Sequence, residues 1–154
     1  MLWICYSTLT VIGAVLHILI AKTPVIYTFL LYFLVINIGA AGVTAFFGHA
    51  FRSDEVAEYI GWPKGNPFQL EIACANLATG TLGILCIWFR GNFWIATAIV
   101  SSVFALGAGV VHIMEIIRNK NYSPGNAGMP LYFDFIKPIV VWCLMIAYLL
   151  GFKG

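Results

Sequence analysis

The sequence predicts an all-α membrane protein: a polytopic transmembrane helix bundle of about five spanning helices with one short interfacial helix. The 154 residues are 62% hydrophobic and only 9% charged, whereas ordinary globular chains are about 45–50% apolar and about 25% charged. Five apolar runs approach the roughly 20 residues that a membrane span needs. No stretch alternates as a strand does. We therefore expect one transmembrane domain, residues 1–154, in the cell membrane with the lipid bilayer as its partner. The net charge of +2 argues against nucleic acid.

The first span is expected at residues 2–21. No positive residues precede it, and Ala21-Lys22-Thr23 is a poor cleavage site, so we interpret this run as a retained helix and not a signal peptide. Thr23-Pro24 then predicts a helix start, with Thr23 as the cap and proline in the first turn. The second span should cover residues 25–51.

A polar stretch at residues 52–66 follows the second span. Ser53 is a candidate cap for a short helix with an apolar face, and Trp62 is typical of the membrane interface. We expect this helix to lie flat on the membrane surface. Its solvated face is expected to hold Asp54, Glu55 and Glu58.

The third span has a clear start signal: Asn66 as the cap, Pro67 at the first position, and Gln69 placed to complete a capping box. It is expected to run to residue 89. The tight turn at residues 90–92 predicts that the third and fourth spans are antiparallel neighbours.

The fourth span is expected at residues 93–118 and the fifth at residues 131–152. The segment between them, 119–130, is rich in Asn, Gly and Pro and is predicted to be a loop. Pro138 should kink the fifth span and leave the carbonyl of Asp134 without its helical partner.

Five spans would gather the acids at one end of the bundle, which we call side A, and would place the termini on opposite sides of the membrane. The six acids expected there are Asp54, Glu55, Glu58, Glu71, Glu115 and Asp134, together with His49 and His112. The opposite end, side B, receives Lys22, Arg90, Lys153 and His17. Ionisable groups at membrane depth are costly and usually mark a function or pair with one another.

Helical spacing indicates which of these groups face the bundle interior. One face of the fourth span is expected to hold Ser101, Ala105, Ala108, His112 and Glu115. One face of the second span should hold Gly42, Ala45 and His49. The third span has a face of small residues, formed by Ala73, Asn76, Gly80 and Gly83. Asn37 lies deeper and is expected to hydrogen-bond another helix. Imidazole and carboxylate together suit Zn or non-haem Fe. The candidate metal ligands are His49, Glu71, His112 and Glu115.

Other interpretations of the same groups stay open. They could form an internal ion-pair network, with Lys137 paired to Glu115 or Asp134, and Glu71 paired to a histidine or Arg118. His49 and His112 could bind haem b, or the site could be a lipid-headgroup or quinone pocket. His17 is expected to be an interfacial or core histidine. The four cysteines are expected to be free thiols in helix packing.

The middle of the chain carries a family resemblance. Its segments Ile60-Gly61-Trp62-Pro63 and Pro67-Phe68-Gln69-Leu70-Glu71 resemble an uncharacterised family of small prokaryotic integral membrane proteins, over roughly residues 40–120. That family is distantly similar to the DoxX-like four-helix membrane proteins, whose members include quinone-linked oxidoreductase subunits. The resemblance implies redox work by analogy alone.

Two hypotheses follow for function. In the first, the protein is an integral membrane protein whose buried polar site is structural, or which serves as a subunit of a membrane complex or homo-oligomer. In the alternative, it is a small membrane redox enzyme, quinone- or metal-linked, or a subunit of one. A transporter is disfavoured, because the first and fifth spans lack polar groups at mid-membrane. The sequence does not decide whether the protein is an enzyme.

Overall fold

A computed structural model describes residues 2–152, and Lys153 lies outside that range. The described residues are helical and contain no strand, which confirms the predicted all-α class. Five helical segments are long and apolar enough to cross a membrane, so the chain is compatible with a multi-pass membrane protein. The elements are α1 (Leu2–Ala21), α2 (Val25–Tyr32), η1 (Phe33–Ala40), α3 (Ala41–Phe51), α4 (Ser53–Ile60), α5 (Phe68–Leu85), α6 (Asn92–Asn119), α7 (Pro124–Ala127) and α8 (Met129–Leu149).

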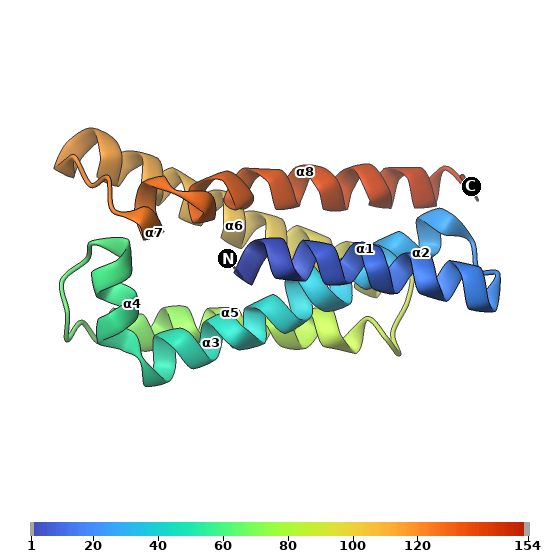
Figure 1. Cartoon of the computed structure of the whole chain (residues 1–154), viewed down its shortest axis with the longest axis horizontal. Helices are drawn as coiled ribbons and strands as arrows, with labels where there is room; N and C mark the ends of the chain where they lie inside the picture. The colour runs from blue at the N-terminus through green and yellow to red at the C-terminus, as the bar shows by residue number, and fades with distance from the viewer. Residues whose placement is uncertain (1, 153–154) are drawn as a thin grey trace.

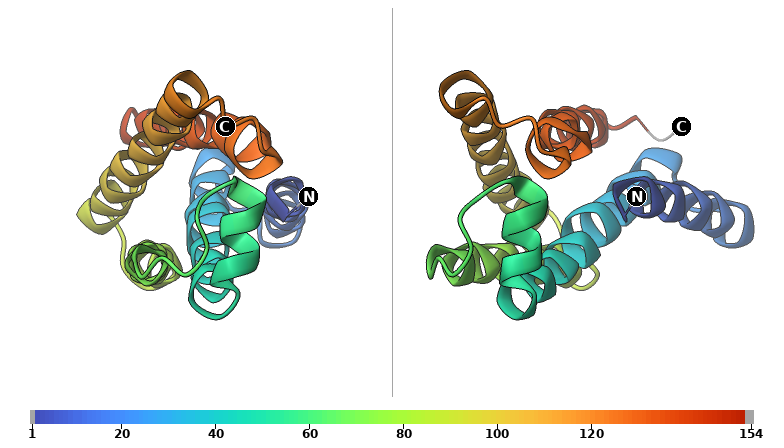
Figure 2. Two further views of the ribbon diagram at one scale, coloured as in Figure 1. Left: turned by 90° about the vertical axis from the view of Figure 1, so that its left-hand side faces the viewer. Right: turned by 60° about the vertical axis from the view of Figure 1, so that its left-hand side comes forward.

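The long helices run along the long axis of the molecule, as Figure 1 shows. The end that holds α4, α7 and the start of α8 is side A, at the left of that view, and the C-terminal end of α8 lies at side B. The short helix α4 crosses the side A end almost at right angles to the bundle, as the interfacial helix was expected to do (Figure 2).

The second span contains a segment that the sequence did not predict. Between α2 and α3 the helix widens into a π-helix, η1, without a break in the chain direction. Such segments are rare and are frequent at functional sites. Asn37 lies within η1, is buried, and donates a hydrogen bond to Thr10 of α1 at 2.6 Å. This contact confirms the expected bond between Asn37 and another helix.

Three helix starts differ in detail from the capping predictions. At α2 the cap position falls on Pro24 and not on Thr23, and no side chain caps this helix. The Asn66 side chain accepts a hydrogen bond from the backbone of Phe68 at 2.9 Å, as a cap does, but Gln69 does not close the capping box. The Gln69 side chain bonds His49 instead. At α4, Ser53 is the first helical residue and makes no capping hydrogen bond.

The ends of two other elements also differ from expectation. Helix α5 ends at Leu85 and not at residue 89, because residues 86–88 form a turn. The predicted loop at 119–130 is wrong in part, since it contains the single turn of α7 and the start of α8. Lys120 has φ 54°, a left-handed conformation that ends α6.

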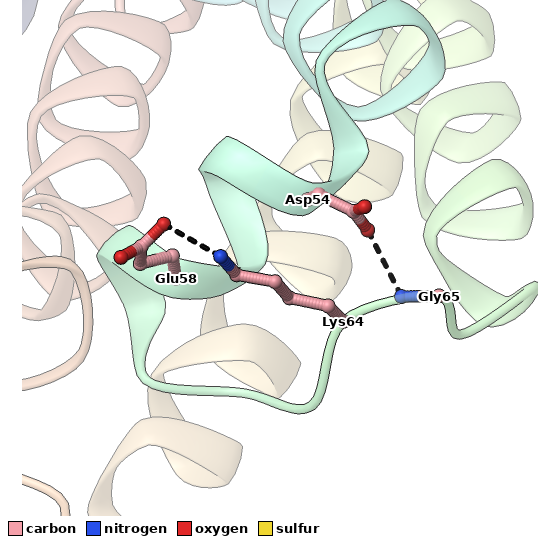
Figure 3. A network of polar contacts seen from close by, with 4 residues as sticks. All are labelled: Asp54, Glu58, Lys64 and Gly65. Atoms are coloured by element: carbon pink, nitrogen blue, oxygen red, sulfur yellow. Dashed lines mark hydrogen bonds and ion pairs between the residues drawn. The ribbon is translucent and has the colours of Figure 1, made fainter.

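The acidic residues of α4 form the solvated face that the sequence predicted, and they tie α4 to the following loop (Figure 3). Glu58 pairs with Lys64 at 2.8 Å, and Asp54 Oδ1 accepts a hydrogen bond from the Gly65 backbone at 2.9 Å. Glu55 pairs with Arg52, and the hydrogen bond from that guanidinium holds the pKa of the Glu55 carboxyl below its ordinary value. The opposite face of α4 buries Ala57 and Ile60.

The spanning helices pack in two groups, with α5 along α3 and η1, and α6 along α8. Glycines bring the first group together: a Cβ at Gly42 would lie 2.8 Å from the backbone of Gly80. In the second group Trp142 donates a hydrogen bond to Ser102 at 3.1 Å. Helices α5 and α6 are antiparallel, as the tight turn predicted, but they diverge away from that turn towards side A (Figures 1 and 2).

The five spans predict the positions of the termini. Reporter fusions at Met1 and Gly154 should report opposite sides of the membrane, because an odd number of crossings separates them. Fusions that both report the same side would contradict the five-span arrangement, and with it the gathering of acids at side A.

Candidate functional site: a cavity between the helix groups

A cavity of about 610 Å³ lies between the two groups of helices. Its walls come from η1, α3, α5, α6 and α8, and residues of α4, α7 and the Trp62 turn close its side A end. Most of the lining is apolar. The amide and ionisable side chains that line it belong to Asn37, His49, Asn76, His112, Asp134 and Lys137.

The sequence-predicted faces meet in this cavity. Gly42, Ala45 and His49 line it from α3, as their shared face predicted. From α6 the lining includes Ser101, Ala105, Ala108 and His112, which confirms four of the five positions expected there. Small residues on both sides leave the room that the cavity occupies.

The wall between α5 and α6 contains lining residues that are exposed on the outside of the bundle. Val103 and Phe68 both line the cavity, yet 68% and 51% of their surfaces are exposed. Gly107 also lines the cavity and is exposed, and a Cβ added there would meet no atom within 4 Å. These residues belong to helices long and apolar enough to cross a membrane.

His112 is held in one orientation by Asn126. Asn126 is fully buried, and its amide nitrogen donates to the carbonyls of His112 at 3.2 Å and Asn121 at 2.9 Å. Its Oδ1 atom lies 2.7 Å from His112 Nδ1. Since the amide nitrogen is already committed to two acceptors, the network assigns Oδ1 as the acceptor and Nδ1 as the protonated ring nitrogen. The Trp62 ring stacks on the imidazole with centroids 6.3 Å apart.

His112 Nε2 faces the Asp134 carboxyl group at 3.6 Å from Oδ2. Within residues 2–152, this Oδ2 atom is buried and has no hydrogen-bond partner. Lys137, one turn further along α8, places its ammonium 3.7 Å from the centre of the Trp3 ring. The ion-pair prediction for Lys137 is therefore wrong in its partner, because the ammonium contacts an aromatic face instead of pairing with Asp134 or Glu115.

His49 lies on the opposite wall from His112. Its Nδ1 atom is 2.6 Å from Oε1 of the buried Gln69. Sequence reasoning placed Gln69 in a helix cap and Asn126 in a plain loop, so it missed both partners of the histidines. Gln69 could have been recognised as a histidine partner, because it is a polar side chain at the start of an otherwise apolar helix. Nothing in the sequence marked Asn126 as a partner, because Asn is common in turns.

The four candidate metal ligands do not form one cluster. Glu71 is exposed on α5, and Glu115 accepts a hydrogen bond from Asn119 at 2.8 Å. Glu115 lines an adjoining cavity of about 680 Å³ at side A, whose lining does not include His112. Across residues 2–152, no three His, Cys, Asp or Glu side chains are arranged to hold a metal ion. Bound Zn, Fe or haem b stays a prediction from the sequence.

Comparison with known proteins identifies the family. A model described as "Family of unknown function (DUF6790)" matches residues 1–149. The chain belongs to this family. No curated protein and no solved structure matches the chain. The match agrees with the expected resemblance to an uncharacterised family, whereas the similarity to DoxX-like proteins stays a prediction.

In this DUF6790 chain the cavity therefore combines two chemical environments. Its long apolar walls suit a hydrocarbon or ring system, and its side A end offers an imidazole and a carboxylate that are largely shielded from water. Such groups can accept hydrogen bonds and exchange protons with a bound molecule. Concave sites of about 300–1,000 Å³ with few polar groups are typical of small-molecule binding.

Proposed function

We propose that the protein binds an amphipathic, lipid-soluble molecule inside the membrane, with the polar end of that molecule against His112 and Asp134. The observation that carries the proposal is the cavity itself. It lies among helices long and apolar enough to span a membrane and has exposed lining residues between α5 and α6. It also contains a buried carboxylate oxygen that has no hydrogen-bond partner in the described part of the chain.

Three features of the site support this proposal over a purely structural role. A structural network would satisfy its own members, whereas Asp134 Oδ2 has no hydrogen-bond partner among residues 2–152. The glycines and alanines of the lining leave space open that larger side chains would fill. The exposed wall at Val103 and Gly107 gives a route from the bilayer that does not cross water.

Binding and a subunit role are compatible, and a ligand held beside an imidazole and a carboxylate is placed for proton exchange. A redox reaction with a quinone or a metal, the alternative from the sequence, would use the same cavity. The binding proposal does not require that reaction.

Filling the cavity tests the proposal. Gly107→Trp adds an indole where nothing lies within 4 Å of the new Cβ, so the ring can occupy the cavity without displacing the backbone. Native mass spectrometry of protein extracted from membranes should then show a co-purified small molecule in the parent and its loss in this variant. Val110→Trp is the matched control, because Val110 is 51% exposed on the same helix and does not line the cavity. Equal retention in both variants, or no bound molecule in the parent, would contradict the proposal.

A further inference from the structure

We infer that the polar end of the cavity recognises a hydroxyl group, so that the ligand is a lipid-soluble alcohol or phenol held by Asp134 and His112. This inference rests on the proposed function and adds the chemical class of the head group. It follows from which atoms at the site can donate a hydrogen bond and which can only accept one.

The His112 ring presents an acceptor to the cavity side. Asn126 has both amide hydrogens committed to backbone carbonyls, so the Nδ1–H of His112 donates to Asn126 Oδ1. In a neutral imidazole with Nδ1 protonated, Nε2 carries the lone pair. This nitrogen points towards Asp134 and not towards the Asn126 loop.

The neighbouring carboxylate is also an acceptor. Asp134 Oδ2 lies 3.6 Å from His112 Nε2, beyond the roughly 2.7–3.2 Å of a normal hydrogen bond to nitrogen. When His112 is neutral, two acceptors thus lie side by side, and within the described residues Oδ2 has no donor. A buried acceptor in this state is costly. The site is complementary to a group that supplies a donor.

A hydroxyl group meets this requirement better than head groups that only accept hydrogen bonds or that carry a negative charge. An ether or ketone oxygen only accepts, and would leave both protein atoms without a donor. A carboxylate or phosphate would add negative charge beside Asp134 in a region of low dielectric. The ammonium of Lys137, which also lines the cavity, is already placed over the Trp3 ring. A hydroxyl donates one hydrogen bond and can still accept another.

A matched pair of probes tests the head group. Affinities of purified protein in detergent for 4-nonylphenol and for its methyl ether, 4-nonylanisole, can be measured by tryptophan fluorescence, since Trp62 stacks on His112. The phenol should bind about tenfold or more tightly, because a hydrogen bond to a charged acceptor is worth that much or more. Equal affinity for the two probes would overturn the inference.

Variants of Asp134 test whether its carboxylate causes the preference for the phenol over the methyl ether. Asp134→Leu should reduce the preference for the phenol most strongly, without abolishing it, because His112 Nε2 then remains as the acceptor at this end. Asp134→Asn keeps the size and one acceptor oxygen, so the preference should shrink and not vanish, and this variant serves if the leucine variant does not fold. Glu115→Gln removes an acid on α6 that does not line the cavity, and should leave the preference unchanged. A full preference in Asp134→Leu would contradict the inference.

Two further measurements separate the possible failures. Decanoate binding that exceeds phenol binding and falls in Lys137→Met would identify an anionic head group and overturn the hydroxyl assignment. If both aromatic probes bind equally and Gly107→Trp blocks both, the cavity binds ligand but not through a hydroxyl. If neither probe binds, the proposed function fails together with the inference.

Discussion

Asn126→Ala is expected to destabilise the protein by about 3–5 kcal/mol, since it strands several buried polar groups at once. The substitution removes buried hydrogen bonds to the carbonyl and the ring of His112, and a partly buried one to the carbonyl of Asn121. The melting temperature of the detergent-solubilised variant should be lower than that of the parent by about 10 °C or more.

Asn119→Ala is the matched control for this prediction. Asn119 is exposed and makes one side-chain hydrogen bond, to Glu115. Its loss should change stability by about 0.5 kcal/mol or less. Similar melting temperatures for the two alanine variants would mean that the Asn126 network does not hold α7 and α6 together.

Gly42→Ala is expected to cost about 2–3 kcal/mol through overpacking. The added methyl group would lie 2.8 Å from the Cα and N atoms of Gly80 and from the carbonyl oxygen of Asn76. These are backbone atoms of α5, so they cannot rotate away as a side chain can. Relief requires that α3 and α5 separate, which would also disturb the cavity wall.

Gly107→Ala controls for the general effect of alanine in a helix. A Cβ at this position meets nothing within 4 Å, and alanine is favoured over glycine in a helix by about 1 kcal/mol. The melting temperature should therefore hold or rise. A fall equal to that of Gly42→Ala would contradict the close approach of α3 and α5.

The spans could be predicted because length and composition decide them. Five apolar runs are bounded by proline, glycine and polar residues, which fixes where each helix can begin and end. The observed helical segments agree with the predicted spans to within a few residues at most ends. The π-helix η1 could not be predicted, since its sequence is as apolar and regular as that of its neighbours. Whether a helix widens there depends on the helices packed around it.

Helical spacing predicted which residues face the cavity, but it did not predict the hydrogen-bond partners of the two histidines. His49 and His112 point inward because they follow small residues at helical intervals. Glu115 was expected on the same face as His112, but three residues turn a helix by about 300° and not a full circle. That difference contributes to placing Glu115 at the adjoining cavity. The bonds to Gln69 and Asn126 join segments that only the tertiary fold brings together.

Photolabelling in membranes would test most directly whether the cavity takes ligand from the bilayer. An alkylphenol with a diazirine in its chain can be activated in native membranes and its attachment sites located by peptide mass spectrometry. The binding proposal predicts saturable labelling of cavity-lining residues such as Ile72, Ser101 and Ala108, suppressed by excess 4-nonylphenol. Labelling that rises in proportion to probe concentration and is confined to exposed positions outside the cavity, such as Val110 and Ile139, would contradict it.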